Sequence, residues 1–192
     1  MAAINRCGWC GDDALYVAYH DQEWGYPQYD ARILFEFLIL EGVQAGLSWI
    51  TVLRKRENYR EAFDAFDPEK IARYGKRKIN QLLKNEGIVR NRLKIESAVN
   101  NAQRFLAIEE TGSFSDYLWS FVDGKPIQNR FSSLSEVPAK TPISDTMSKT
   151  LKKDGFNFVG STICYAHMQA TGMVNDHILG CHRYKTCKAA SR

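Results

Sequence analysis

The chain has 192 residues, of which 44% are hydrophobic and 25% are charged, the balance of an ordinary globular protein. Its formal net charge of +4 permits a nucleic-acid partner without requiring one, so the distribution of the charges has to decide. No apolar run approaches the roughly 18 residues of a membrane span, and the N-terminus lacks the features of a signal peptide. We therefore expect a cytoplasmic protein with no membrane partner, whose five cysteines are thiols or metal ligands rather than disulfides.

The first half of the chain has the pattern of consecutive helices. Residues that can cap a helix precede four of them. Asp12 and Asp13 precede a helix over 14–24, Asp30 precedes one that ends near Gly42, Ser48 precedes one over 49–63, and Asp67–Pro68 opens a short helix. A fifth helix is predicted over 76–85. The helix after Asp30 is apolar on nearly all sides, from Ile33 to Leu40, which is typical of a fully buried helix.

The second half continues in the same way. After a break at Glu86–Gly87, apolar residues from Ile95 to Leu106 have the spacing of a long amphipathic helix, and residues 114–122 form another. Residues 123–143 hold three of the five prolines, which predicts a long surface loop. Helices are expected from Ser144 and Ser161, the latter being the last. No segment alternates over five or more positions, so the prediction is an all-α fold without strands.

Glu41 is the most informative residue of the buried helix. It lies seven residues after Leu34 and four after Phe37, so it continues the inward face. Burial and a nearby helix C-terminus both disfavour a carboxylate. One interpretation is that Glu41 caps a neighbouring helix or pairs with an arginine. The other is a carboxylate at the floor of an aromatic pocket.

Cysteine and histidine residues gather at the two ends of the chain. Cys7 and His20 lie near the start, and His177 and Cys181 are four apart near the end, a spacing that shares one face if a helix persists there. Two thiolates and two imidazoles suit a closed, structural Zn²⁺ site. Buried core residues are the alternative. The rival ligands are Cys10, Cys164, Cys187, His167 and His182.

Aromatic residues cluster near the N-terminus. Tyr16 and Tyr19 are three apart and share a helical face, with Trp9 before them and Trp24 after them. Such a stripe is more often core than a binding site, but the polar residues 21–23 favour a position of Trp24 near the surface. Aromatic faces with one buried carboxylate suit a planar, electron-poor or cationic ligand.

The stretch from Lys76 to Lys94 is basic, with Glu86 as its single acid. Its seven basic residues are Lys76, Arg77, Lys78, Lys84, Arg90, Arg92 and Lys94. A helix break at Gly87 followed at once by a new helix would offer free N–H groups to a phosphate. A solvated charged face with a glycine cap is an equally good explanation.

Several long motifs resemble those of the bacterial 3-methyladenine DNA glycosylase I family, within the helix-hairpin-helix DNA glycosylases. They are CGW at 7–9, LYVAYHDQEWG at 15–25, LFEFLILEGVQAGLSWITVLRKRENYREAF at 34–63, GIVRNRLKI at 87–95, YLWSFV at 117–122, LKKDGFNFVGSTICY at 151–165 and GMVNDH at 172–177. The resemblance runs from Cys7 to about Cys181.

The resemblance implies one helix-hairpin-helix DNA glycosylase-like domain over residues 1–192, with the hairpin at about 76–95. The segments at about 7–24 and 160–181 would pack around a structural Zn²⁺ held by Cys7, His20, His177 and Cys181. The implied base pocket holds Glu41 as the catalytic residue and is lined by Tyr16, Tyr19, Trp24 and Trp49. The implied DNA contacts are Gly46 and Leu47 against the lesion, and Gly87, Ile88, Val89, Arg90 and Arg92 on the backbone.

The implied activity is hydrolysis of the N-glycosidic bond of 3-methyladenine in alkylated double-stranded DNA. It would release the free base and leave an abasic site, in the bacterial cytoplasm and with a monomeric enzyme. The hairpin lacks the lysine expected of a glycosylase that is also a lyase, and no downstream acid matches the usual catalytic aspartate. Two other classes compete, a DNA-binding module without catalysis and a zinc hydrolase. The module would leave Glu41 without a purpose, and a hydrolase needs an open metal position that four protein ligands exclude.

Overall fold

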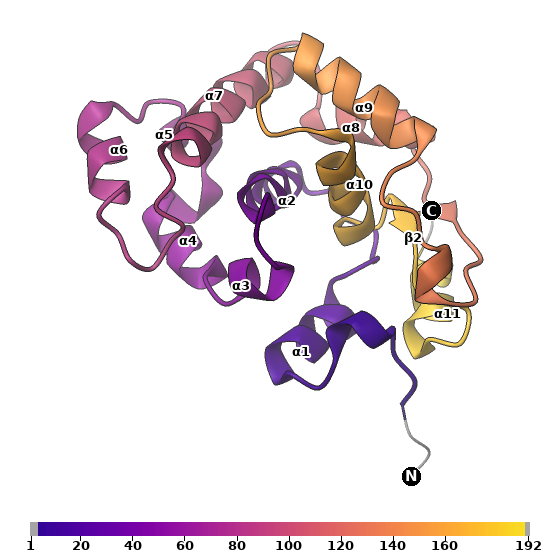
Figure 1. Ribbon diagram of the computed structural model, residues 1–192. Helices are drawn as coiled ribbons and strands as arrows, with labels where there is room; N and C mark the ends of the chain where they lie inside the picture. Colours follow the sequence, from indigo (N-terminus) through magenta and orange to yellow (C-terminus); the bar gives the residue numbers. More distant parts are fainter. Residues whose placement is uncertain (1–3, 191–192) are drawn as a thin grey trace.

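The computed structural model describes residues 4–190, and Figure 1 shows their helical architecture. The α-helices are α1 (Ala14–Gln22), α2 (Ala31–Gln44), α3 (Trp49–Leu53), α4 (Arg56–Ala62), α5 (Pro68–Ile71), α6 (Lys76–Leu82), α7 (Arg92–Glu109), α8 (Phe114–Trp119), α9 (Pro142–Lys153), α10 (Ser161–Ala170) and α11 (His182–Ala189). Short 3-10 helices are η1 (Gly8–Cys10), η2 (Asp64–Phe66), η3 (Ser120–Val122) and η4 (Leu134–Glu136). The predominantly helical fold confirms the prediction from the sequence. No helix of the described part is long and apolar enough to cross a membrane.

Local signals located most helix starts correctly. The side chains of Asp13, Asp30 and Asp67 each accept hydrogen bonds from the first backbone N–H groups of α1, α2 and α5. The expected start of α9 at Ser144 was wrong by two residues. That helix begins at Pro142, and Thr141 and Ser144 form a reciprocal capping box around its first turn.

The helix predicted over 49–63 is two helices in the structure. α3 ends at Leu53 and α4 begins at Arg56. Ser48 occupies the N-cap position of α3, but its hydroxyl hydrogen-bonds the hydroxyl of Thr51 at 2.7 Å rather than a backbone N–H. The turn between them lets α3 pack against α2 while α4 packs against η2.

The central helix α2 is buried from Leu34 to Val43 and packs against α3, α7, α8 and α10 (Figure 1). The sequence predicted that Gly42 ends it, but the helix continues to Gln44. Gly42 instead permits close packing, because a Cβ added there would lie 3.1 Å from the Cβ of Phe158. Glu41 is therefore inside the last turn, with its backbone held by the helix.

Two short elements at the C-terminal end were not predicted. Ile127–Gln128 (β1) pairs in parallel with Val174–Asn175 (β2), a ladder too short to show alternation in the sequence. Helix α11 follows Cys181, although α10 was expected to be the last helix. Its sequence gives little signal, because the buried residues of this helix are Tyr184 and Cys187 and the rest is mainly polar.

The long segment 123–143 crosses the surface, as predicted, but it is anchored to the C-terminal region. The side-chain amide of Asn129 donates to Asp176 at 2.6 Å, and the backbone N–H of Leu179 donates to the carbonyl of Phe131 at 2.9 Å. The hydroxyl of Tyr184 also donates to the carbonyl of Asn129. These bonds hold η4 in place next to the N-terminal segment, where Leu134 lies 3.6 Å from a Cβ built on Gly8.

Candidate functional site

A cavity opens between η1, α1, the end of α2, the start of α3, α10 and η4. Its lining residues are Trp9, Tyr16, Tyr19, Trp24, Glu41, Gln44, Trp49, Leu134, Val137, Ala166, Gln169 and Asp176. All five residues predicted for a base pocket are among them. The sequence placed Trp9 with the aromatic cluster but not in the pocket, and Gln44 is an additional lining residue. Nothing in the sequence marked the η4 or α10 residues, whose position depends on the anchored 123–143 segment and on the packing of α10 against α2.

Glu41 is a buried acid without a cation. It is 3% exposed, and its Oε2 has no hydrogen-bond partner among the described residues. Burial raises the pKa of its carboxyl group from 4.5 to about 8. The alternative that Glu41 pairs with an arginine is wrong, because the buried Arg56 instead bonds Glu36 at 2.6 Å and Glu23 at 2.6 Å. An unpartnered buried carboxyl group that lines a cavity indicates a ligand.

The aromatic side chains form two contacting groups around Glu41. Trp9 contacts Tyr16 and Trp24, with ring centroids 5.0 Å apart in both pairs, while Tyr19 lies 5.4 Å from Trp49. The indole N–H groups of Trp9 and Trp49 are buried and have no partner in the described part of the chain. The lining thus combines π faces with unsatisfied donors and an unsatisfied acid. Such a site suits a flat heterocycle that carries both an amino group and ring nitrogens.

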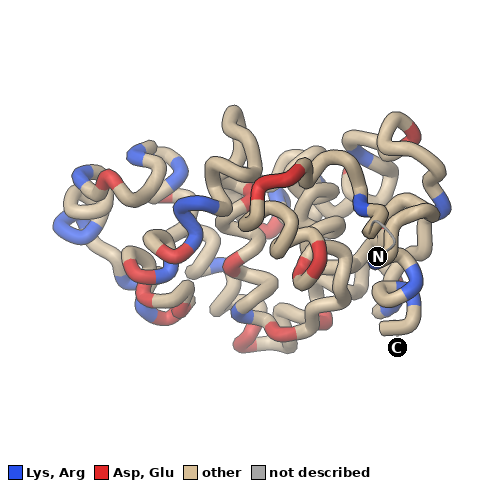
Figure 2. Tube along the Cα trace, turned by 90° about the horizontal axis from the view of Figure 1, so that it is seen from below, with Lys and Arg blue, Asp and Glu red and all other residues tan. Residues whose placement is uncertain are grey.

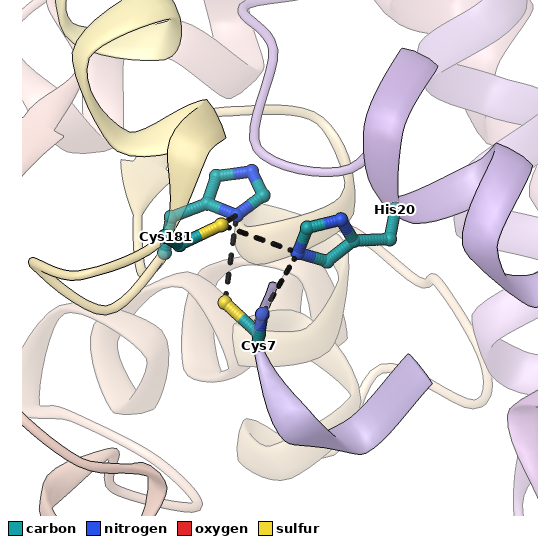
Figure 3. A group of neighbouring side chains, drawn as sticks. Cys7, His20 and Cys181 are labelled. Carbon is teal, nitrogen blue, oxygen red and sulfur yellow. Dashed lines mark hydrogen bonds between the residues drawn. The ribbon is translucent and has the colours of Figure 1, made fainter. Parts of the chain in front are cut away.

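Next to the cavity lies a cluster of four buried metal-binding side chains, those of Cys7, His20, His177 and Cys181. Their ligand atoms all lie within 4.8 Å of one another. His177 Nδ1 is 3.6 Å from Cys7 Sγ and 3.4 Å from Cys181 Sγ, and His20 Nε2 is 3.5 Å from Cys181 Sγ. Figure 3 shows Cys7, His20 and Cys181 directed toward one another. Zn–S and Zn–N bonds of about 2.3 and 2.0–2.1 Å in a tetrahedron place neighbouring ligands about 3.6 Å apart, so the donor set fits Zn²⁺.

Outer hydrogen bonds orient both histidines for metal binding. His177 Nε2 donates to the carbonyl of Trp24 at 2.9 Å, which leaves Nδ1 free to face the thiols. His20 Nδ1 hydrogen-bonds Asp21 at 2.7 Å, and its Nε2 faces Cys181. The Arg6 guanidinium beside Asp21 holds the pKa of that carboxyl group down at about 2, with a smaller contribution from His20.

The two thiols of the cluster affect each other's pKa in opposite directions. The interaction with Cys181, together with burial, raises the pKa of Cys7, and the interactions with Cys7 and the two histidines lower the pKa of Cys181. A bound dication would take up both sulfurs as thiolates, because only the thiolate is a metal ligand.

The prediction that helical spacing brings His177 and Cys181 together was wrong. His177 and Cys181 do not share a helix: His177 lies in the loop after β2, and Cys181 is the N-cap residue of α11. The loop, rather than helical spacing, brings the two side chains together. The five rival ligands are not part of the cluster. Cys10 donates its thiol to the carbonyl of Cys7 at 3.2 Å, and His167 is a core residue on α10 whose pKa burial lowers to about 4.

The hairpin between α6 and α7 differs from its predicted form. α7 begins at Arg92, so the new helix does not follow Gly87 at once. The N–H of Gly87 donates to Asn85 Oδ1 at 2.8 Å, and the N–H of Val89 donates to the hydroxyl of Tyr59 at 3.0 Å. Ile88 is buried. Gly87, Ile88 and Val89 therefore fix the turn against α4. The carbonyls of Glu86 and Gly87 in this turn accept hydrogen bonds from the side chains of Lys55 and Asn58.

The basic stretch contributes exposed cations from α6 and the hairpin. Arg90 and Arg92 are exposed, each with a long i,i+4 contact to Glu86 and Glu96 respectively. Figure 2 shows Lys and Arg segments gathered at the end of the molecule that carries α6, with acidic segments among them. Lys94 is an exception, because its side chain is buried. Gly46 and Leu47 are exposed in the loop between α2 and α3, and Gly46 has a φ of 80°.

The helical fold and the aromatic cavity with its buried acid match those predicted for a DNA glycosylase. The chain belongs to the methyladenine glycosylase family, whose model matches residues 9–184. It is 52% identical over 182 residues to DNA-3-methyladenine glycosylase 1 of Escherichia coli (strain K12), covering 94% of this chain and 97% of that protein. It is 53% identical over 177 residues to the DNA-3-methyladenine glycosylase of Haemophilus influenzae, covering 92% and 96%.

Solved structures of this family have the same fold. A crystal structure of a 3-methyladenine DNA glycosylase I matches with a TM-score of 0.91 and 55% identity, over 93% of this chain and 98% of that chain. The Staphylococcus aureus 3-methyladenine DNA glycosylase I, solved to describe 3-methyladenine recognition, matches with a TM-score of 0.90 and 41% identity, over 94% and 97%.

Proposed function

We propose that this protein is a DNA-3-methyladenine glycosylase, which hydrolyses the N-glycosidic bond of 3-methyladenine in alkylated DNA. The free base leaves and an abasic site remains in the strand. Membership of the methyladenine glycosylase family supports this function, together with the relatives of matching length. The single observation that carries it is the unpartnered carboxyl group of Glu41, buried in a cavity with aromatic walls.

The chemistry requires recognition more than acid catalysis. Methylation at N3 gives adenine a delocalised positive charge, so the base departs as a neutral molecule and the bond to the sugar is already weak. The enzyme must lower the remaining barrier by interactions that are stronger in the transition state than in the ground state. It must also extrude the nucleotide from the duplex, which costs a few kcal/mol.

Glu41 is the residue that distinguishes the methylated base. In the empty cavity its raised pKa keeps the carboxyl group largely protonated at neutral pH. A cationic ring within a few ångströms favours the ionised form, which then accepts a hydrogen bond from the exocyclic amine. Normal adenine lacks the charge and cannot offset the cost of ionising this group. Tyr16, Tyr19, Trp24 and Trp49 supply the faces against which the cationic ring stacks.

DNA is held outside the cavity by two segments of the chain. We assign the sequence-independent grip to the hairpin, where Arg90 and Arg92 are exposed and Gly87, Ile88 and Val89 shape the turn that presents them. Gly46 and Leu47 extend from the loop that joins Glu41 to Trp49, so they would meet the duplex at the extruded nucleotide. We also propose that the protein acts on double-stranded DNA as a monomer.

Zinc is the metal that fits the terminal cluster, and its role would be structural. Cys7, His20, His177 and Cys181 provide four ligands, which leave no position for a substrate or a water. When bound, the ion ties residues of the N-terminal segment to the loop before α11. The ligands adjoin the cavity, since His20 follows Tyr19 and Asp176 precedes His177.

Release of the base from alkylated DNA tests this function directly. Methylated duplex DNA is incubated with the protein, and the released bases are separated and identified. We expect 3-methyladenine, with the strand left intact at the abasic site until alkali is added. Release of no base, or of unmodified adenine at a comparable rate, would refute the proposal. The Glu41→Gln variant provides the matched control for activity from a contaminating enzyme.

A further inference from the structure

Lys94 is a buried cation at the junction of the hairpin and the cavity. It lies on the first turn of α7, two residues after Arg92, yet it is only 9% exposed. Its ammonium group donates to the carbonyl of Val43 at 2.6 Å and to that of Ala45 at 2.6 Å. The side chain therefore crosses from the hairpin to the C-terminal end of α2. In the sequence, Lys94 was one of the seven basic residues of this stretch, and nothing there distinguished it as buried.

The two carbonyls that accept from Lys94 lie next to the cavity and the loop 45–48. Val43 and Ala45 flank Gln44, which lines the cavity, and Val43 is two residues after Glu41. Ala45 is the C-cap residue of α2 and opens the loop with Gly46 and Leu47. A positive charge satisfies the last carbonyls of a helix particularly well, because the negative end of the helix dipole lies there.

No acid in the described part of the chain forms an ion pair with Lys94, which sets it apart from the buried Arg56 with its two glutamates. Burial also lowers the pKa of its ammonium group. A buried ammonium group held by two carbonyls alone is costly. A neutral residue could pack between two helices, whereas a charge bound to both carbonyls fixes their position with respect to α7.

We propose that Lys94 is a positioning residue that couples the DNA-gripping hairpin to the cavity. It holds the end of α2 and the loop 45–48 at a fixed distance from Arg90 and Arg92. DNA bound by the hairpin then presents its extruded nucleotide in register with Glu41. The inference rests on the proposed glycosylase function, in which one duplex contacts the hairpin and the lesion loop together.

We expect loss of the Lys94 hydrogen bonds to lower the rate of excision rather than the affinity for DNA. Without the two hydrogen bonds the loop can shift by a fraction of an ångström to an ångström relative to the hairpin. A misplacement of that size costs up to about 100-fold in rate when the reacting groups must meet in one geometry. The cations that hold the backbone are unchanged, so the affinity for DNA stays.

Steady-state kinetics on methylated DNA separates the two contributions. For Lys94→Met we expect kcat to fall by about 10- to 100-fold, with KM and the Kd for undamaged duplex changed by less than about 3-fold. Lys94→Arg should recover most of kcat, because it retains a charged donor. Arg90→Met serves as the contrasting variant: it removes a backbone contact, so its KM should rise while kcat stays.

Binding of free 3-methyladenine, followed by tryptophan fluorescence, completes the test. Lys94→Met should bind the free base within about 3-fold of wild type, because the cavity walls come from other elements. An unchanged kcat would overturn the inference. So would a loss of free-base affinity as large as the loss of kcat, since Lys94 would then only support the cavity itself.

Thermal unfolding of each Lys94 variant distinguishes a loss of activity from a loss of folding. If Lys94→Met does not fold, Lys94→Gln, which retains one donor without the charge, is measured in the same way. Wild-type kcat per folded molecule in Lys94→Gln overturns the coupling role. The wild-type protein is run in parallel, because its failure to release 3-methyladenine would refute the proposed function and not the role of Lys94.

Discussion

His177 donates from Nε2 to the backbone carbonyl of Trp24 at 2.9 Å, and its ring lies 4.7 Å from the Trp24 ring in an edge arrangement. The same histidine presents Nδ1 to the two thiols of the metal cluster. One side chain thus belongs to both parts of the site. Gly25 makes this approach possible, because a Cβ added there would lie 3.0 Å from the His177 ring. The four-residue cluster of Cys7, His20, His177 and Cys181 and the aromatic cavity are therefore mechanically linked.

This link gives the first prediction, that one zinc ion per chain supports the cavity as well as the termini. Cys181→Ser should lose the metal and lower the melting temperature by about 10 °C, which is roughly 3 kcal/mol in a chain of this size. Affinity for free 3-methyladenine should fall with it. Elemental analysis and thermal unfolding check both effects. Cys10→Ser is the control, since Cys10 lies outside the cluster. Freshly purified protein without zinc would contradict the prediction.

The second prediction concerns Glu41 as a residue for binding the base rather than for stability. Glu41→Gln retains the size of the side chain but loses a charge-assisted hydrogen bond of about 1.5–3 kcal/mol to the base. Excision should fall by roughly one to two orders of magnitude, and the variant should be at least as stable as wild type. Single-turnover excision and melting curves on the same preparations measure this. A destabilised variant with full activity per folded molecule would end the assignment.

The third prediction is the pH dependence of stability caused by Glu41. Burial raises its pKa from 4.5 to about 8, so between these pH values the folded protein retains a proton that the unfolded chain loses. Unfolding then releases a proton, and wild-type stability falls as pH rises. The advantage of Glu41→Gln should therefore grow across this window by up to about 1.4 kcal/mol per pH unit and level off on either side.

Denaturant unfolding of both proteins at a series of pH values checks the third prediction. The difference between the two free energies of unfolding is the quantity to plot, because other titrating groups contribute equally to both. A difference that does not change with pH would show that Glu41 has an ordinary pKa in the folded protein.

The fourth prediction concerns the hairpin. Reversing Arg90 and Arg92 to Glu should weaken binding to damaged and undamaged duplexes alike, and should flatten the dependence of the Kd on salt. Gly87→Ala should act less directly. Its added Cβ would lie 3.0 Å from Asn85 Oδ1 and 3.1 Å from Asn58, and so would push the turn away from α4. If these arginine variants bind DNA with unchanged affinity, Arg90 and Arg92 belong to an ordinary solvated face and do not contact DNA.

Local chemistry accounts for what could be predicted from the sequence. Asp13, Asp30 and Asp67 were recognised as helix caps because a cap involves backbone groups two or three residues away. Glu41 was placed on the buried face because helical spacing fixes its direction from neighbours within two turns. The sequence motifs also identified the family, because they include the helices that contain these residues.

Tertiary packing decided the remainder, because it depends on contacts between residues far apart in the chain. His177 lies 170 residues from Cys7, and only the packing of the two ends of the chain brings them together. Leu134 and Asp176 reach the cavity through anchors such as the bond from Asn129 to Asp176, which no local pattern encodes. Lys94 looks like its exposed basic neighbours in the sequence. Only the approach of the end of α2 to α7 buries it, because the carbonyls of Val43 and Ala45 that hold its ammonium group lie 51 and 49 residues away in the chain.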